Sequence, residues 1–440
     1  MLLSPRPLAA ALLLCWAALT QAQNLSELAP LARAHDAALQ AAQAQWQAAQ
    51  SRAQQAQAGL LPSAALTGSA GYARTDVSRP PIDLHAPTQS LAVQASQPLY
   101  RPANRITLQQ AERGVELARA QLDAAEQDLL VRLGQRYFDV LGAQDTLQAL
   151  RAQKKAVQEQ LAAAQRNFEV GTATITDARE AQARHDLVQA QELAAQNEWQ
   201  VRQLALDDLV GRAGVQPTPL ASPTPLPPLP AGTLQEWADR AETQQPLVRQ
   251  ALLAVDVARL ETAKAETGHL PTLDLQAGYA LQRQPNGSVT APGIHSHANV
   301  ASVGLALNLP LFAGFAVQNR VRETLSLQER AQADLDNARR SAAQAARSAF
   351  LGVQSGRAQV QALQAAEASS QLALQANLLG YEAGMRVNID VLNAQSQLYQ
   401  TQRDLALARY QVLVGTLRLK QAAGTLELQD VQALDSLLAR

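Results

Sequence analysis

The two halves of the chain repeat one another at a constant spacing, and this repeat limits the fold to two similar units in tandem. Residues 168–177 match residues 381–390, an offset of 213 positions. The same offset relates Gly211 to Gly424. Each half is expected to contain a helix, two strands and two long helices, in that order.

The repeat sets the expected domain boundaries. Residues 217–230 contain seven prolines in fourteen positions, which excludes a helix and predicts an extended crossover between the halves. The predicted order is a first repeat at 23–216 with strands near 64–76 and 89–98, the crossover at 217–231, a second repeat at 232–424 with strands near 272–283 and 299–309, and a C-terminal tail at 425–440.

Two segments predict unusually long helices. Ala103 to Phe168 has no proline, and its apolar residues recur every three or four positions. At about 1.5 Å per residue, this helix would be roughly 100 Å long. Near the C-terminus, one run of apolar and small residues predicts a coiled-coil seam: Leu398, Thr401, Leu405, Ala408, Val412, Gly415 and Leu419. Because ordinary helices have about a dozen residues, these segments indicate an elongated bundle or a helical tube.

Four segments alternate between apolar and polar or small residues. They are Leu66–Tyr72, Leu91–Gln97, Thr272–Leu281 and Ala301–Leu309. The pattern is typical of a strand with lipid on one side and water on the other, and equally of a half-buried strand in a soluble sheet. The intervening segments Asp76–Gln89 and Arg283–Ala298 are expected to be exposed hairpin loops.

The number of strands limits how such a chain can enter a membrane. Four strands cannot close a membrane barrel, because the smallest such barrels have about eight. Open strand edges are not tolerated in lipid, where no water satisfies their backbone groups. A membrane location therefore requires several chains to share one barrel.

The first 22 residues are expected to be a secretory signal. Arg6 precedes an apolar stretch at Leu8–Leu19, small residues follow, and the mature chain should begin near Gln23. The alternatives are a membrane anchor, for which the stretch is too short, and a lipoprotein signal. Cys15, the only cysteine, follows a bulky leucine within the apolar stretch, which argues against the lipoprotein. The mature chain should then have no disulfide or cysteine site.

Charge and motif content exclude other functions. With 37 basic and 38 acidic residues, the net charge is -1, and no basic surface for nucleic acid is expected. Phosphate-binding loops, zinc-protease motifs and nucleophile elbows are missing from the sequence, so neither an enzyme nor a cofactor is expected. His295 and His297 could chelate a metal, but an exposed loop pair without a further ligand is the simpler interpretation.

Each repeat also contains a predicted turn between its two long helices. Gly171 and Gly384 are suited to the left-handed conformation that ends a helix. Thr174 or Thr176 in the first repeat and Asn388 in the second are candidate caps of the helices that follow.

The repeated motifs resemble the TolC family of outer-membrane efflux proteins over essentially the whole mature sequence. The motifs are Arg136–Leu141, Phe168–Asp177, Tyr381–Gln395 and Leu417–Leu426, and they are similar to the branch that serves type I secretion and multidrug export. The resemblance implies an α+β membrane protein, a homotrimer with a twelve-stranded β-barrel continued by a long α-helical coiled-coil barrel. It implies the outer membrane of a Gram-negative bacterium, with a large periplasmic portion.

The resemblance further implies an exit duct for small toxic compounds or proteins. Its partners would be outer-membrane lipid, a periplasmic membrane-fusion adaptor and an inner-membrane ABC or RND pump. A soluble periplasmic adaptor or scaffold is the alternative function. That alternative explains the helices and the signal but not the duplicated strand pairs.

Finally, the resemblance implies a gate at the inner end of the tunnel. Polar links would involve Thr176 and Asp177 in the first repeat, and Tyr381 and Arg386 in the second. An arginine–carboxylate pair is the stronger kind of link.

The same resemblance assigns a constriction ring to Asp390 and to Asn393, one helical turn later. The family usually has a carboxylate at the second position, so the ring here would carry half the charge. A solvated residue near a helix N-terminus is the structural alternative for Asp390.

Overall fold

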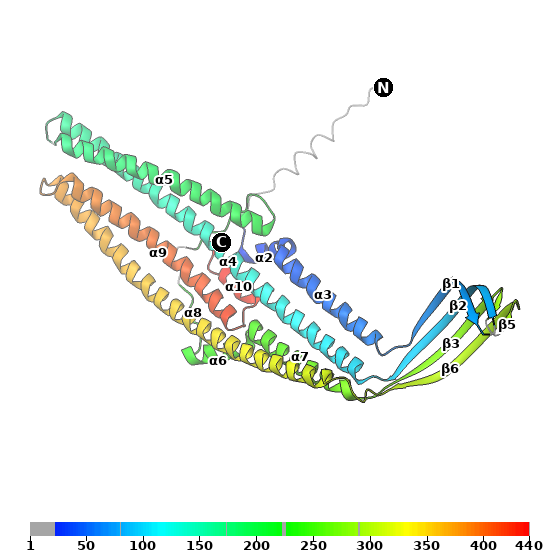
Figure 1. Ribbon diagram of the computed structural model, residues 1–440. Helices are drawn as coiled ribbons and strands as arrows, with labels where there is room; N and C mark the ends of the chain where they lie inside the picture. Colours follow the sequence, from blue (N-terminus) through cyan, green and yellow to red (C-terminus); the bar gives the residue numbers. More distant parts are fainter. Residues whose placement is uncertain (1–22, 80, 173, 222–225, 289–290, 440) are drawn as a thin grey trace, which may run out of the picture. The chain divides into compact units, whose positions relative to one another are not determined.

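A computed structural model describes residues 23–79, 81–172, 174–221, 226–288 and 291–439. The expected signal peptide, residues 1–22, lies outside this described part of the chain. The helices of the described chain are α2 (Leu25–His35), α3 (Ala37–Ala58), α4 (Pro102–Glu169), α5 (Ile175–Val210), α6 (Leu234–Gln244), α7 (Pro246–Glu266), α8 (Ala316–Glu382), α9 (Asn388–Ala422) and α10 (Leu428–Asp435) (Figure 1). Its strands are β1 (Ser63–Ser78), β2 (Pro81–Tyr100), β3 (Thr272–Gln284), β4 (Gly287–Ser288), β5 (Ala291–Pro292) and β6 (Ser296–Asn308).

The chain divides into two compact units. We call one the helical unit: residues up to Ala41, Asp123–Val248 and Arg339 onward. The other, the strand unit, comprises Ala42–Leu122 and Arg249–Ala338. The long helices α4 and α8, of 68 and 67 residues, are equivalent in the two repeats. Among the described residues, no helix combines the length and the apolar character that a membrane crossing needs.

The strand unit contains one four-stranded antiparallel sheet in the order β1-β2-β3-β6. Leu66 pairs with Val93, Val93 with Tyr279, and Tyr279 with Ala301. Because directly paired residues project from the same face, these four residues form one row across the sheet. The neighbouring row, Ala65, Gln94, Gly278 and Ser302, projects from the opposite face. The register thus confirms the predicted alternation.

The predicted hairpin loops are shorter than expected. Pairing of β1 with β2 continues to Ser78 and Pro81, so most of 76–89 is strand, and Leu84 and Ala86 are buried. The prediction was wrong because it relied on the polar composition of this segment and ignored the period-two alternation that continues through it. In the second hairpin, β4 and β5 form a small ladder, and β6 begins at Ser296 rather than near 299.

Close helix packing defines the helical unit. Figure 1 shows α5 alongside α4, and α8 alongside α9. A Cβ atom on Gly134 of α4 would lie only 2.5 Å from Leu417 of α9, so small residues allow these helices to approach closely. The predicted seam of α9 is buried except for half-buried Gly415, and part of it packs on Val360 of α8.

The two ends of the described chain meet beside these helices. Asp435, in α10, accepts hydrogen bonds from the backbone N–H groups of Leu25 and Ser26 at 2.9 and 3.1 Å. The carboxylate thereby satisfies free donors at the start of α2, where the helix dipole favours negative charge. The crossover joins this meeting point of the chain ends, which we call the belt. Leu220 forms a β-bridge with Leu438, and Gln23 forms one with Pro217. The residues described at 217–221 and 226–231 form no helix.

An ion pair fixes the belt to α4. Arg132 donates to Asp36 at 2.8 Å, and Leu39 donates its backbone N–H to the same carboxyl at 2.7 Å. The hydrogen bond from Arg132 holds the pKa of Asp36 below its usual value, against the opposing effect of burial. The folded state therefore favours the charged form of Asp36.

Gly424, at the end of α9, provides a stability test. Its φ is 74°, and an added Cβ would lie 2.5 Å from the Gln244 carbonyl oxygen. Gly384 has a φ of 73° but open space around it. We expect both Gly→Ala changes to add roughly 1–2 kcal/mol of left-handed strain, and Gly424→Ala to cost more through overlap. Thermal unfolding followed by circular dichroism checks this; equal shifts in the midpoint would contradict it.

Candidate functional site

The two turns between the long helices have the same backbone geometry. Gly171 and Gly384 adopt φ values of 78° and 73°, the left-handed conformation expected for them. The N–H of Thr172 donates to Asn167 and that of Met385 to Gly380, both at 2.8 Å, which closes each helix end.

The helices that follow are capped differently from each other. Thr174 caps α5 in a reciprocal box with Asp177, whose carboxylate accepts from the Thr174 N–H at 3.0 Å. Thr176 is therefore not the cap. The prediction that Asn388 caps α9 was wrong, because Val387 is the extended residue before the helix. Asn388 is only 2% exposed, and its amide atoms find no partner in the described chain.

The remaining predicted gate residues lie near these turns. The Tyr381 hydroxyl accepts a hydrogen bond from the Asn167 amide at 3.3 Å, which joins the α8 end to the α4 end. Arg386 forms an ion pair with Asp390 one helical turn away, at 3.6 Å. Among the described residues of one chain, no hydrogen bond or ion pair joins Arg386 to Asp177.

Asn393 forms a second link between the helical hairpins. Its side-chain oxygen accepts from the Arg184 guanidinium, on α5, at 2.8 Å. Sequence reasoning missed both Arg184 and Asn167, because neither belongs to the repeated motif. Their only sequence signal is that each lies within ten residues of a predicted gate position. Thus Tyr381 and Asn393 connect the two hairpins, whereas Arg386 and Asp390 pair within one turn.

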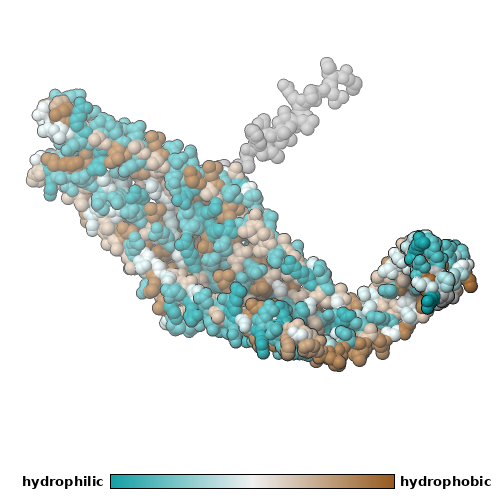
Figure 2. All heavy atoms as spheres, in the orientation of Figure 1, coloured by the Kyte–Doolittle hydropathy of each residue, from teal (hydrophilic) through white to brown (hydrophobic). Residues whose placement is uncertain are grey.

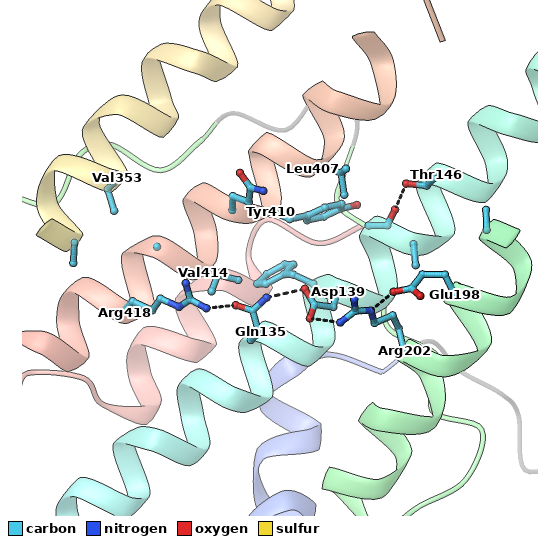
Figure 3. A pocket seen from close by; sticks show the side chains of 18 of the residues that line it. Gln135, Asp139, Thr146, Glu198, Arg202, Val353, Leu407, Tyr410, Val414 and Arg418 are labelled. Atoms are coloured by element: carbon cyan, nitrogen blue, oxygen red, sulfur yellow. Dashed lines mark hydrogen bonds and ion pairs between the residues drawn. The ribbon is translucent and has the colours of Figure 1, made fainter. Parts of the chain in front are cut away.

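Farther along the same helices, a pocket of about 670 Å³ lies among α4, α5, α8 and α9. Figure 3 shows a continuous polar chain on one side of it. Arg418 donates to Gln135 at 2.7 Å, and Gln135 donates to Asp139 at 2.7 Å. Arg202 donates to Asp139 at 3.5 Å and to Glu198 at 2.6 Å. The two arginines and two carboxylates balance each other's charge.

Aromatic and aliphatic residues form the other side of this pocket. Phe138 stacks on Tyr410 with ring centroids 5.7 Å apart, beside Val353 and Leu407. The Tyr410 hydroxyl donates to Asp145 at 2.6 Å. Burial raises the pKa of Asp145, and burial together with the Asp145 charge raises that of Tyr410. The pocket thus has a charged, polar wall beside an aromatic and aliphatic one.

Metal chemistry has little support in this arrangement. Across the residues that the structure describes, no group of three or more His, Cys, Asp or Glu side chains could hold a metal ion. His295 and His297 are both exposed, and His297 lies in β6 rather than in a loop. The site thus consists of inter-hairpin links near the turns and a pocket with one polar wall.

Comparison with known proteins identifies the family. A family model described as outer membrane efflux protein matches residues 28–212 and 237–425, one segment for each repeat. Outer membrane protein TolC of Vibrio cholerae is 31% identical over 415 residues, covering 94% of each chain. Proteases secretion protein PrtF of Dickeya chrysanthemi is 31% identical over 425 residues, covering 94% of this chain and 91% of its own.

Solved structures share the fold. The outer membrane protein VceC of Vibrio cholerae has a TM-score of 0.78 and 20% identity, covering 91% of this chain and 96% of its own. The CmeC outer membrane channel of Campylobacter jejuni has a TM-score of 0.80 and 17% identity, covering 96% and 91%. The chain therefore belongs to the outer membrane efflux protein family, whose members are outer-membrane channels and not enzymes.

Proposed function

We propose that three copies of this chain form one exit duct of a tripartite efflux or type I secretion system, closed at its periplasmic end by a gate. The observation that carries this proposal is the apolar face of the sheet. Val303, Leu305 and Leu307 alternate along β6 and are highly exposed, and Val303 reaches 78%. Burying such a face in lipid is favourable by roughly 25 cal/mol per Å².

The apolar surface continues where the strands join the helices. Figure 2 shows hydrophobic residues gathered at this junction in the strand unit. Leu311 and Phe312, between β6 and α8, are 90% and 77% exposed. Aromatic residues at this level are typical of the boundary between lipid and water. This supports outer-membrane lipid as a partner of the sheet.

The sheet edges support the trimer. Strands β1 and β6 form its two edges, so each has one side without a partner in this sheet. In lipid, unpaired backbone groups cost several kcal/mol each. Pairing β1 of one copy with β6 of the next satisfies both edges, and three copies supply twelve strands, enough to close a barrel.

The gate follows from the links at the hairpin turns. Within one chain, Asn167–Tyr381 and Arg184–Asn393 hold the two hairpins together. Arg386 is 60% exposed at its side chain. In the proposed trimer, Arg386 reaches Thr176 or Asp177 of the neighbouring copy, which leaves Asp390 in the constriction ring. Opening then requires the hairpins to separate.

The remaining partners are a periplasmic adaptor and an inner-membrane ABC or RND pump. The chain itself provides a passage and no energy source, so another component must drive export. PrtF is named for secretion of proteases, which supports an ATP-driven protein exporter among the possible pumps. The duct, rather than an adaptor or scaffold, is the function that the relatives support.

Mass and conductance together test the duct. We expect native mass spectrometry of the full chain in mild detergent to give three copies per particle, and planar bilayers to show low, cation-preferring conductance. A monomer that stays soluble without detergent and never inserts would return the protein to the scaffold alternative.

A further inference from the structure

A second, smaller cavity lies among α4, α5 and α9 in the helical unit. It encloses about 250 Å³ and is lined by two arginines, Arg184 and Arg403. Its remaining polar lining is neutral and includes Gln153, Ser396 and Tyr399, and no carboxylate contributes to it. The cavity is thus positively charged and rich in hydrogen-bond donors.

Neither arginine is neutralised by a strong ion pair. Arg184 donates to the neutral Asn393, and no carboxylate among the described residues lies within 4.0 Å of it. Among the described residues, Arg403 forms an ion pair only with its sequence neighbour Asp404, at 3.3 Å, and both side chains are partly exposed. An exposed pair of this kind contributes about 0–1 kcal/mol, so Arg403 can turn to another anion.

Apart from Asp404, no described carboxylate lies within 4.0 Å of either arginine. Glu192 pairs with Lys154 at 2.6 Å and with Arg151 at 3.2 Å. These two cations, Lys154 first, hold the pKa of Glu192 below its usual value, so Glu192 stays charged and bound to them. Burial is the main cause of the raised pKa of Tyr399, and the charge of Glu159 is a lesser cause. The cavity therefore keeps excess positive charge.

The cavity walls also present hydrogen-bond donors. Gln153 donates to the Ser396 hydroxyl oxygen at 3.3 Å, which leaves the Ser396 hydroxyl hydrogen free to donate to a ligand. Guanidinium groups present planar pairs of N–H donors that match the oxygens of a carboxylate or a phosphate. Two such groups beside neutral donors favour an oxyanion over a cation or a neutral molecule.

We propose that the cavity among α4, α5 and α9 binds an oxyanion group, a phosphate or a carboxylate, between Arg184 and Arg403. The group is either a free ion or the anionic end of a larger exported molecule. Because Arg184 also donates to Asn393, a bound oxyanion competes for the guanidinium that links the two hairpins. Binding requires only one chain and does not depend on the proposed trimer.

Phosphorus NMR titration of the purified full-length protein in detergent, at constant ionic strength, tests the proposal with two probes. Inorganic phosphate represents the free ion, and phenyl phosphate represents an anionic group on a larger molecule. We expect the double variant Arg184→Gln/Arg403→Gln to weaken binding of either probe at least about tenfold, since two charge-assisted contacts are lost. Tighter binding of phenyl phosphate than of phosphate would identify the larger molecule as the source.

Two controls keep the result interpretable. Arg179→Gln removes an exposed arginine of α5 that does not line the cavity, and binding should not change. Arg184→Lys/Arg403→Lys keeps the charges but not the planar donors, and should bind more weakly than the wild type without losing binding. This variant supplies the comparison if the glutamine variant fails to fold. Equal binding by the wild type and the folded glutamine variant, or no binding by the folded wild type, would overturn the proposal. Either result leaves the exit duct untouched, because the duct is tested by mass and conductance.

Discussion

Val303→Arg is expected to prevent assembly of the protein in the outer membrane, whereas Ser302→Arg is expected to permit it. Val303 lies near the middle of β6 on the apolar face, in register with Ala277. An arginine on the lipid side near the bilayer midplane costs about 2–4 kcal/mol. The proposed trimer would bear this cost three times, so the total is of order 10 kcal/mol, comparable to the whole stability of a typical domain.

Ser302 is the matched control because it is the adjacent residue of the same strand. It pairs with Gly278, in the row that faces away from the apolar side. In a barrel wide enough to hold water, an arginine there remains solvated. Membrane fractionation with quantification of the folded protein compares the two variants. Equal amounts of both in the outer membrane would show that the apolar face does not meet lipid.

Local patterns predicted the long helices and strands well, because each depends on residues close in sequence. The proline-free stretch of 103–168 corresponds to α4, and the seam of α9 is buried. The extent of the hairpins was not predictable from composition. Polar side chains at 76–89 suggested a loop, but polar side chains do not prevent strand pairing, which satisfies the backbone N–H and C=O groups of this segment.

The site was predicted less completely, for a physical reason. The turn glycines follow from one backbone requirement, and both adopt it. The links of Asn167 and Arg184, by contrast, depend on which helix faces reach one another across 214 and 209 positions of sequence. A repeat in the sequence shows that two hairpins are alike. It does not show how they face each other, so contacts between hairpins required the structure.

Removing the two inter-hairpin links nearest the turns should open the channel. The variant Tyr381→Phe/Asn393→Ala loses the acceptor of Asn167 and the acceptor of Arg184. A neutral hydrogen bond contributes roughly 0.5–1.5 kcal/mol and one to a charged group about 1.5–3. Solvent near the turns reduces these values, but the three copies of the proposed trimer multiply them. A change of about 5.5 kcal/mol moves a two-state equilibrium from 1:99 to 99:1, so the proposed trimer should change from mostly closed to mostly open.

Single-channel recording in planar bilayers measures the opening, and we expect a several-fold higher mean conductance than in the wild type. Asn377→Ala is the matched control, because among the described residues the Asn377 amide donates within α8, to the Ala373 carbonyl. If the double variant conducts like the wild type, the closed state must be held by contacts between copies, and Arg386→Ala becomes the decisive variant.

If each single variant opens the channel as fully as both together, the two links act as one cooperative unit. Intermediate single effects that add up would instead show independent links, which the proposed adaptor could break one at a time.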